Sequence, residues 1–435
     1  MKKIMIAACM AAFSMSVFAQ SGTNSPYSMY GLGVLSEQTS SFNRGMDGLA
    51  YSFHEKNQIN YLNPASYSAL DSLTFIFDAG ISLHKTNYGE SGHRVNAREA
   101  TFEYAVGAFR VAKKLGVSFG LIPYTNVGYD FSNTKIVNDA SSTTSANTTF
   151  TNTYSGSGGI HQVYLGAGWE PVRGLAVGAN LSYIWGNYTR AVTNTYSDAY
   201  VNTLQKQYSA EISSYKIDFG MQYTARINRR NAITLGLTYG IGHNLHADPQ
   251  CIIKSNNSQT GVSSSDTLTI QDGLHIPNTF GAGLLWNHKD RLKIGFDYQL
   301  QSWGKLESPD YVYEGNTPVY KMVSGLYQDR HKMTFGGDFC PAERSHRFFN
   351  RLHYRAGVSY ATPYIKINGK DGPKEISVSA GVGIPIINGY NNRSMLNISG
   401  QWMNRSCDGL VKENSFRINI GFTFNERWFA KFKVD

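Results

Sequence analysis

The chain has 435 residues, a formal net charge of +9, only 16% charged residues and a mean hydropathy of −0.32. After the N-terminus no segment offers the roughly 18 consecutive apolar residues of a membrane-spanning helix, which excludes a helical membrane protein. The excess of Lys and Arg forms no basic block with interleaved aromatic residues, so the composition indicates no nucleic-acid partner.

The first nineteen residues have the three parts of an export signal. Lys2 and Lys3 form the charged start, residues 4–15 are apolar, and residues 17–19 (VFA) form a cleavage site. We therefore expect residues 1–19 to be a signal peptide and the mature chain to begin at Gln20.

Residues 20–70 have an irregular pattern that differs from everything after them. Turn signals occur at Ser25-Pro26, at residues 31–33 (GLG) and at Asn63-Pro64. The change of pattern predicts two domains in the mature chain, which comprise residues 20–70 and residues 71–435.

After residue 71 the chain reads as strands. Residues 416–424 (FRINIGFTF) alternate large apolar with small or polar side chains, which places one set on each face of a strand. The first strand has the apolar face Leu73, Phe75, Phe77, Ala79, Ile81 and Leu83, the second is marked by Phe102, Tyr104, Val106 and Ala108, and the third covers residues 115–131. Eleven more strands centre near Leu165, Leu181, Phe219, Leu235, Leu284, Phe296, Phe335, Val358, Val378, Ile398 and Ile420.

Short and long connections alternate between these strands. The short ones lie at residues 113–114, 171–173, 228–231, 288–291 and 388–392, with a somewhat longer one at residues 341–350. The long polar ones lie at residues 132–159, 187–207, 247–274 and 305–328. This rhythm predicts an all-β fold, a fourteen-stranded antiparallel transmembrane β-barrel with tight periplasmic turns and long outer loops. An even number of strands places both termini in the periplasm.

Aromatic residues are abundant, with 28 Tyr and 6 Trp. These side chains suit the two membrane interfaces of a barrel. We therefore expect the outer membrane of a Gram-negative bacterium, with membrane lipids and lipopolysaccharide as neighbours of the barrel and of its excess positive charge.

In four places the sequence resembles the FadL-type outer-membrane transporters of long-chain fatty acids and other hydrophobic compounds. These are residues 43–50 with 60–67 (NRGMDGLA and NYLNPASY), 120–129 (GLIPYTNVGY), 177–183 (VGANLSY) and 421–429 (GFTFNERWF). The resemblance implies an N-terminal hatch that plugs the barrel, a kinked third strand, and passive uptake of apolar substrates. Met29 departs from the family, which has a basic residue there.

Two motifs are singled out as parts of the transport route. A proline in a central strand removes a ladder donor, so Pro123, with Gly120 and Tyr124, marks either a lateral exit or a bulge that only shapes the barrel. The resemblance favours the lateral exit. Asn63, Pro64 and Ala65 form the hatch motif, a turn that holds the hatch or simply an ordinary turn.

Charged and apolar residues directed into the lumen are candidates for a ligand pocket. Alternation points Lys293, Lys332 and Arg355 inward, and Arg44 lies on the hatch, where each of them could bind a fatty-acid carboxylate or pair with Asp297 or Asp338. The apolar candidates are Met46, Leu49, Tyr61 and Leu62, which form either the pocket wall or the core of the hatch.

No catalytic or metal site is predicted. Residues 116–120 (GVSFG) match a nucleophile-elbow pattern but lie in a strand and not at a strand-to-helix turn. Cys251, Cys340 and Cys407 fit no zinc or redox spacing, and isolated thiols are favoured over a Cys251–Cys407 disulfide. We expect no cofactor.

The sequence therefore predicts a monomeric channel, without enzymatic activity, for passive uptake of long-chain fatty acids or other hydrophobic compounds. The hatch rearranges and the substrate leaves beside the third strand. The alternative is a FadL-like barrel that acts as a binding or assembly partner in protein secretion. A membrane-embedded lipid-modifying enzyme is the third hypothesis.

Overall fold

The computed structural model describes residues 23–90, 93–137, 148–315, 317–343, 345–386 and 394–427. The predicted signal peptide, the connection at residues 388–392, and Trp428 and Phe429 lie outside the described residues. In the described part of the chain no helix is long and apolar enough to span a membrane.

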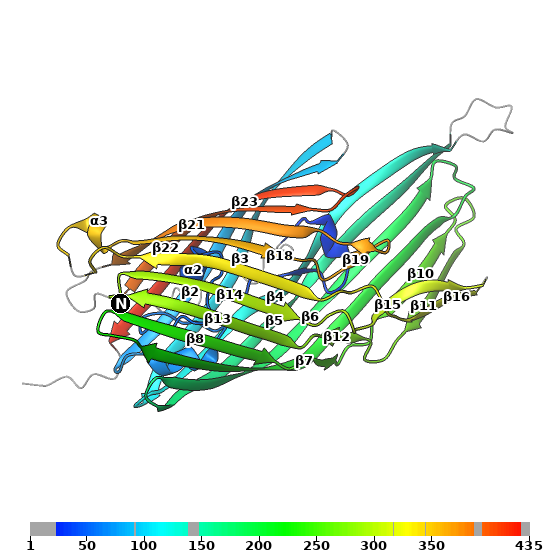
Figure 1. Ribbon diagram of the computed structural model, residues 1–435. Helices are drawn as coiled ribbons and strands as arrows, with labels where there is room; N and C mark the ends of the chain where they lie inside the picture. The colour runs from blue at the N-terminus through cyan, green and yellow to red at the C-terminus, as the bar shows by residue number, and fades with distance from the viewer. Residues whose placement is uncertain are drawn as a thin grey trace, which may run out of the picture.

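Fourteen antiparallel strands of the described residues form one closed wall (Figure 1), which confirms the predicted fold class. The pairing of the first wall strand with the last, over residues 74–89 and 412–427, closes the barrel. The wall strands are β2 (Thr74–Glu90), β3 (His93–Ala112), β4 (Leu115–Val137), β5 (Thr148–Val172), β6 (Leu175–Tyr196), β7 (Thr203–Arg226), β8 (Asn231–Gly240), β13 (Thr279–His288), β14 (Leu292–Gln301), β17 (Arg330–Phe339), β18 (His353–Ala361), β21 (Lys374–Ile386), β22 (Ser394–Ser406) and β23 (Lys412–Arg427).

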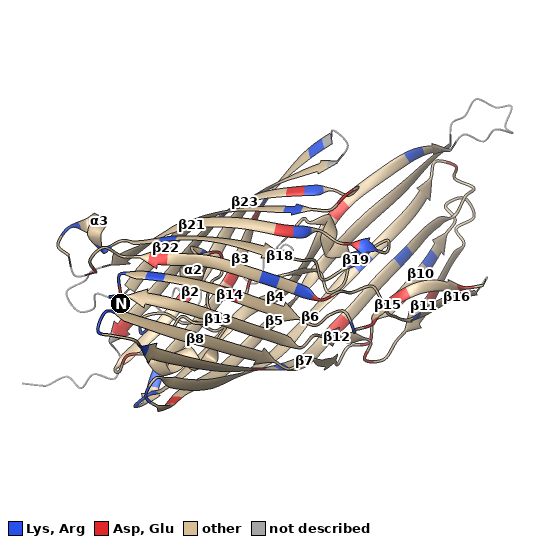
Figure 2. Ribbon diagram, viewed as in Figure 1, with Lys and Arg blue, Asp and Glu red and all other residues tan. Residues whose placement is uncertain are grey.

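The outer face of the wall is apolar, as alternation predicts. Leu181 is 59% exposed and Phe422 is 39% exposed, whereas their neighbours Asn180 and Asn419 are 4% and 1% exposed. Large apolar side chains on the outside of a closed barrel are what a lipid-facing surface requires. In Figure 2 the strands that face the viewer are mostly free of charge at mid-height, and charged residues gather towards the two ends.

Strand β3 changes face at a bulge. Gly80 of β2 pairs with Tyr104 and Ile81 pairs with Phe102, so Glu103 has no partner on β2. The extra residue lets Glu103 and Tyr104 both point inward, where both are buried. The four residues that predicted this strand therefore do not share one face. Tyr104, Val106 and Ala108, which follow the bulge, are buried inside the barrel and do not face lipid.

The barrel has two different ends. Tight turns at residues 113–114, 173–174, 227–230 and 289–291, together with the short helix α3 (Phe348–Arg351), form the short-turn end, as predicted. At the other end, β4 to β7 continue as strands through most of residues 132–137, 148–159, 187–196 and 203–207. The prediction of loops there was wrong. A strand with both faces in water does not need alternating apolar and polar residues. Backbone pairing and the strand propensity of Thr and Tyr are enough to keep these residues extended.

Further hairpins complete this extended end. Strand β10 (Gln250–Asn256) pairs with residues 203–209 of β7, and β11 (Ser263–Thr269) pairs with β10. The smaller pairs are β9 (His243–Leu245) with β12 (Leu274–Ile276), β15 (Ser308–Glu314) with β16 (Thr317–Val323), and β19 (Lys366–Ile367) with β20 (Lys370–Asp371). Cys251, Cys340 and Cys407 are free thiols, so no Cys251–Cys407 disulfide is present.

Residues 23–70, called the N-terminal segment below, pack against the inner face of the wall and are mostly buried. This segment contains the 3-10 helix η2 (Pro26–Met29), strand β1 (Val34–Leu35), helix α2 (Ser41–Arg44) and the 3-10 helix η3 (Pro64–Ala69). Its backbone is tied to the wall, since the carboxylate of Asp297 accepts hydrogen bonds from the N–H groups of Ala50 and Tyr51. The molecule thus has its core in the lumen.

Candidate functional site

The wall is unpaired along one boundary. Strands β3 and β4 pair only between residues 105–112 and 115–121. Beyond that point β3 continues to His93 with only β2 beside it, and β4 continues to Val137 with β5 beside it. Among the described residues no wall strand joins residues 93–104 to residues 122–137, and we call this boundary the seam. In Figure 1 the hairpin of β2 and β3 diverges from the long strands that follow it.

Pro123 lies where the pairing of β4 with β3 stops. Its carbonyl accepts a hydrogen bond from Nε2 of Gln38 at 2.7 Å. Because the N–H and C=O of one residue in an antiparallel strand point to the same side, the missing donor of Pro123 faces the seam and not β5. Past Leu121, β4 is in effect an edge strand on this side, which is where proline is tolerated.

The two neighbours predicted with Pro123 lie at the same place. A register shift between Pro123 and Thr125 leaves Tyr124 without a partner on β5, and its side chain is buried towards the lumen. At Gly120 a Cβ atom would come within 2.7 Å of the Ala105 carbonyl, so the glycine permits the last close contact between β3 and β4. These residues thus lie together where the seam begins.

The N-terminal segment supplies backbone partners along the seam. In β1, Val34 pairs with Asn126 and Leu35 pairs with Thr125. The N–H of Ser36 donates to the Tyr124 carbonyl at 3.0 Å. The hydroxyl of Ser28 lies 3.1 Å from both the N–H and the carbonyl of Gly128. Short pieces of the N-terminal segment therefore occupy positions that a neighbouring wall strand would fill in a regular barrel.

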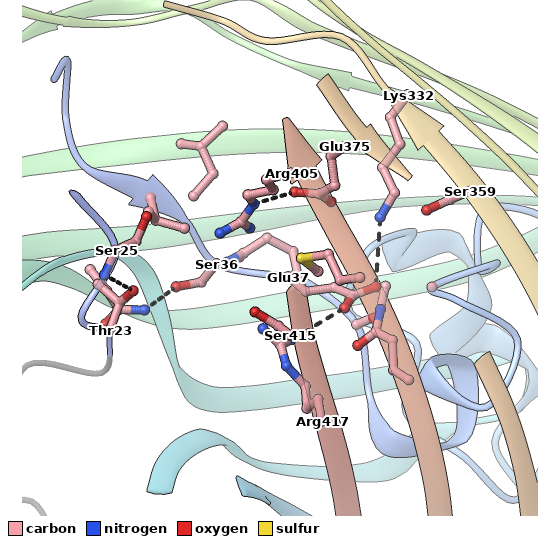
Figure 3. Close-up of a pocket in the computed structure, with 18 of the residues that line it drawn as sticks. Thr23, Ser25, Ser36, Glu37, Lys332, Ser359, Glu375, Arg405, Ser415 and Arg417 are labelled. Carbon is pink, nitrogen blue, oxygen red and sulfur yellow. Dashed lines mark hydrogen bonds and ion pairs between the residues drawn. The ribbon is translucent and has the colours of Figure 1, made fainter. Parts of the chain in front are cut away.

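A cavity of about 140 Å³ lies behind β1. Figure 3 shows that its side chains come from the N-terminal segment and from several wall strands. Few of its lining residues are apolar. The charged ones are Glu37, Glu99, Glu103, Asp297, Arg330, Lys332, Glu375, Arg405, Glu413 and Arg417.

Glu37 projects into the cavity from the residue between Ser36 and Gln38. Its carboxylate lies 3.6 Å from Nζ of Lys332 and 3.8 Å from Nη1 of Arg417, which approach from different sides (Figure 3). Burial alone would raise the pKa of Glu37, but Lys332, Arg44 and Arg417 together hold this pKa below its ordinary value. The side chain is therefore a buried, charged carboxylate.

The predicted ligand residues are distributed over the lumen. Lys332 and Leu62 line this cavity. Arg44 pairs with Glu103 at 2.8 Å, Lys293 pairs with Glu55, and Arg355 pairs with Asp338 at 2.9 Å. The three apolar candidates Met46, Leu49 and Tyr61 are buried in packed clusters. Lys293, Lys332 and Arg355 do point inward, as alternation predicts.

The hatch motif seats the N-terminal segment against the wall. The side chain of Asn63 donates to the Tyr51 carbonyl at 2.8 Å and accepts from the N–H of Ala65 at 3.2 Å. A Cβ atom at Gly220 would lie 2.2 Å from Asn63 Oδ1, and one at Gly178 would lie 2.5 Å from the backbone of Pro64. The absence of side chains at these glycines of β6 and β7 thus lets the turn pack directly against the wall.

A second, wider cavity of about 1650 Å³ lies at the short-turn end. Charged residues from both the wall and the N-terminal segment line it, among them Lys56, Arg110, Arg173 and Arg226. In the described part of the chain no group of three His, Cys, Asp or Glu side chains is placed to hold a metal ion.

Most of the charged residues that line the cavity were not predicted as site residues from the sequence, and Glu37, Arg330 and Arg417 illustrate why. Glu37 lies in a segment without periodicity, so no pattern indicated its direction. Alternation could have indicated that Arg330 and Arg417 point inward. Arg330 lies two residues before Lys332, which points inward, and Arg417 lies between two outward-facing residues. The period of two was a sufficient signal for both.

Solved structures with the same fold are known. The chain matches the P. putida toluene transporter TodX with 14% identity and a TM-score of 0.60, covering 91% of this chain and 100% of that one. The Ralstonia pickettii toluene transporter TbuX has 12% identity and a TM-score of 0.60, with 90% of this chain and 99% of that one covered. A Pseudomonas aeruginosa FadL homologue has 11% identity and a TM-score of 0.57, with 91% of this chain and 100% of that one covered.

No curated protein matches the chain. A family model described as BamG matches residues 1–435, the whole length. The chain therefore belongs to the BamG family, and its barrel has the FadL-type fold that the sequence resembles.

Proposed function

We propose that this chain is an outer-membrane channel for hydrophobic compounds, in which the N-terminal segment acts as a hatch and the substrate leaves sideways through the seam. The observation that carries the proposal is the seam itself. Residues 93–104 and 122–137 are not paired with each other, and parts of the N-terminal segment lie along this boundary.

The energetics of the seam support a gate. An unpaired backbone group in lipid costs several kcal/mol, so a barrel gains nothing from leaving two strand edges apart. Within the described part of the N-terminal segment, only Val34 and Leu35 form ladder pairs with β4, whereas β5 pairs with β4 over many residues. Separating β1 from β4 therefore breaks far fewer backbone hydrogen bonds than separating two full wall strands would.

The fold supports the substrate class. TodX and TbuX are toluene transporters by name, and their barrels have the same fold as this chain. In the proposed orientation the short-turn end and both termini are periplasmic. The extended end is outside, beside lipopolysaccharide, and the channel works as a monomer without catalytic residues.

Uptake of labelled oleate tests the proposal. Cells that lack their own long-chain fatty-acid channel would express this protein, or an empty vector, at a level checked by immunoblot. The proposal predicts oleate accumulation that depends on the protein, with no increase in uptake of a polar solute of similar mass. Equal oleate accumulation with the protein and with the empty vector would refute it.

A second candidate function is a binding or assembly partner in protein secretion. It is favoured by the cavity beside the seam, which is small and lined mainly by polar and charged side chains, where a channel for apolar solutes would have an apolar wall. Extraction in mild detergent distinguishes the two, since a stoichiometric partner protein that co-purifies, together with absent oleate uptake, would favour this role.

A further inference from the structure

One connection at the short-turn end differs from its neighbours. The turns at residues 113–114 (KK), 227–230 (INRR) and 289–291 (KDR) are short and rich in charge. Residues 340–352, called the α3 loop below, form a longer connection between β17 and β18, and the structure describes all of them except residue 344. Figure 1 shows α3 at the short-turn end, on the left, beyond the ends of the neighbouring strands.

Hydrogen bonds fix the shape of the α3 loop. The N–H of Ala342 donates to the Asn350 carbonyl at 2.8 Å, and the side-chain amide of Asn350 donates to the Ser345 hydroxyl at 3.4 Å. The N–H of Cys340 donates to the Arg291 carbonyl of the neighbouring turn at 2.8 Å. These bonds join both halves of the loop to each other and to the wall, so they set the directions of the side chains on α3.

The helix α3 presents different side chains on its two sides. Arg351 lines the wide cavity at the short-turn end. Phe348 and Phe349 are 48% and 72% exposed, and their ring centroids lie 5.6 Å apart. Arg347 beside them is also exposed. By comparison, Leu181 on the lipid-facing wall is 59% exposed, so the phenylalanine pair is as accessible as a side chain that faces lipid.

The exposed side of α3 continues the lipid-facing surface of the wall. Phe339 is the last residue of β17 and pairs with Tyr354, the second residue of β18. Both point outward, with 45% and 38% of their side chains exposed. The Tyr354 hydroxyl donates to the Phe349 carbonyl at 3.1 Å. Because Tyr354 lies on the outer face, this bond places the backbone of α3 at the outer rim of the barrel.

Phenylalanines next to arginines are typical of a segment at a membrane interface. Aromatic rings are favoured at the level of the lipid headgroups, and an arginine there keeps its alkyl stem among apolar groups while its guanidinium meets phosphate. Residues 341–352 (PAERSHRFFNRL) contain three Arg and one Glu. This excess of positive charge is complementary to anionic headgroups.

We propose that the α3 loop is a membrane-interface anchor, in which Phe348 and Phe349 insert into the periplasmic leaflet of the outer membrane and Arg347 binds a phospholipid phosphate. The anchor holds the ends of β17 and β18 at a fixed depth, while charged turns such as residues 227–230 stay in water. This inference goes beyond transport and holds equally for a channel and for an assembly partner.

Spin labelling of the full-length protein in lipid nanodiscs tests the insertion. A nitroxide would be attached at Phe349→Cys, or at Arg229→Cys as the matched control in a charged turn, after replacing the three free cysteines by Ser. Both positions are exposed, so the labels fit without repacking the wall. We expect the label at position 349 to be more accessible to oxygen, which concentrates in lipid, than to a water-soluble nickel chelate, and the label at position 229 to show the reverse.

Equal accessibility of the two labels to the nickel chelate would overturn the anchor and leave the phenylalanine pair as a surface for a protein partner. Oleate uptake does not enter this measurement, so failure of the channel proposal leaves the anchor intact.

Retention of lipid tests the role of Arg347. Native mass spectrometry would measure the binding of phosphatidylglycerol to the detergent-solubilised protein and to its Arg347→Gln and Arg229→Gln variants. We expect Arg347→Gln to bind about fivefold more weakly, which corresponds to about 1 kcal/mol for one cation at a lipid surface, and Arg229→Gln to match the unmodified protein. Equal binding by Arg347→Gln and the unmodified protein would refute the phosphate contact.

Discussion

Arg44 illustrates how a charge is accommodated inside this barrel. Its side chain is fully buried, its Nε donates to the Thr39 carbonyl at 3.0 Å, and its Nη2 donates to the Glu37 carbonyl at 3.1 Å. The same Nη2 lies 2.8 Å from the carboxylate of Glu103 on β3. The residue thus links the N-terminal segment to one edge of the seam, and these two nitrogens already have partners.

Breaking this pair should be costly. Arg44→Met removes the closest cation of the buried Glu103 carboxylate, and breaking a buried ion pair in this way costs about 3–5 kcal/mol of unfolding free energy. The double variant Arg44→Met with Glu103→Gln should recover a large part of this loss. Urea titration of protein refolded into lipid vesicles measures both, and a single variant within about 1 kcal/mol of the unmodified protein would contradict a structural role for the pair.

The lipid face gives a second prediction for a single residue. Leu181→Arg places a charge on an exposed apolar position of β6 and should cost about 2–4 kcal/mol if it lies near the bilayer midplane. Leu181→Phe keeps the surface apolar and serves as the matched control. The yield of folded protein in vesicles reports the difference, and equal yields of the two variants would mean that this face of β6 does not meet lipid.

Among the elements, β4 combines two roles. Residues 115–121 are an ordinary central strand, and residues beyond them form an edge on the side of the seam. Pro123 is compatible with the edge, because its missing donor lies where no wall strand accepts a bond.

Pro123→Val restores that donor and favours regular pairing. We expect the barrel to remain at least as stable, while uptake of labelled oleate falls. If instead the proline only shapes the wall, uptake will not change. Oleate accumulation in cells with equal amounts of each protein decides between these outcomes.

Strand β1 gives the opposite perturbation. Gly33 has a φ of +97°, and a Cβ atom there would lie 2.6 Å from the Asn126 carbonyl, so Gly33→Ala should push β1 away from β4. We expect faster passage of a hydrophobic dye into vesicles that contain the variant.

Gly261→Ala is the control for the backbone strain alone. Gly261 has a φ of +69° but no atom within 4 Å of the Cβ position. Dye passage in this variant should match that of the unmodified protein. Equal passage in the Gly33 and Gly261 variants would contradict a gating role for β1.

The sequence predicts all of the wall strands, because the period of two depends only on which face meets lipid. It misses the bulge at Glu103, since one extra residue changes the face of β3 without changing the local composition. It also misses the length of β4 to β7, because strands outside the membrane have no apolar face to reveal them. Both omissions concern pairing, which is a tertiary property.

At the scale of the whole molecule, the alternation of short and long connections is sufficient to predict a closed barrel. The candidate site is different, because its contacts join residues far apart in the chain. Glu37 meets Lys332 and Arg417 only after the barrel has closed around the N-terminal segment. Directions of wall residues such as Lys332 were predictable from alternation, whereas the placement of Glu37 was not.

A reversible disulfide between β1 and β4 most directly tests the central claim, that the N-terminal segment gates a lateral exit. Leu35 and Thr125 are paired residues of β1 and β4, and antiparallel partners lie about 4.5–5.5 Å apart at Cα, within the range of a disulfide. Leu35→Cys with Thr125→Cys would be introduced after replacing Cys251, Cys340 and Cys407 by Ser. If the N-terminal segment gates a lateral exit at the seam, the oxidised protein should lose oleate uptake and the reduced protein should regain it. Equal uptake by the oxidised and reduced forms would contradict the gate.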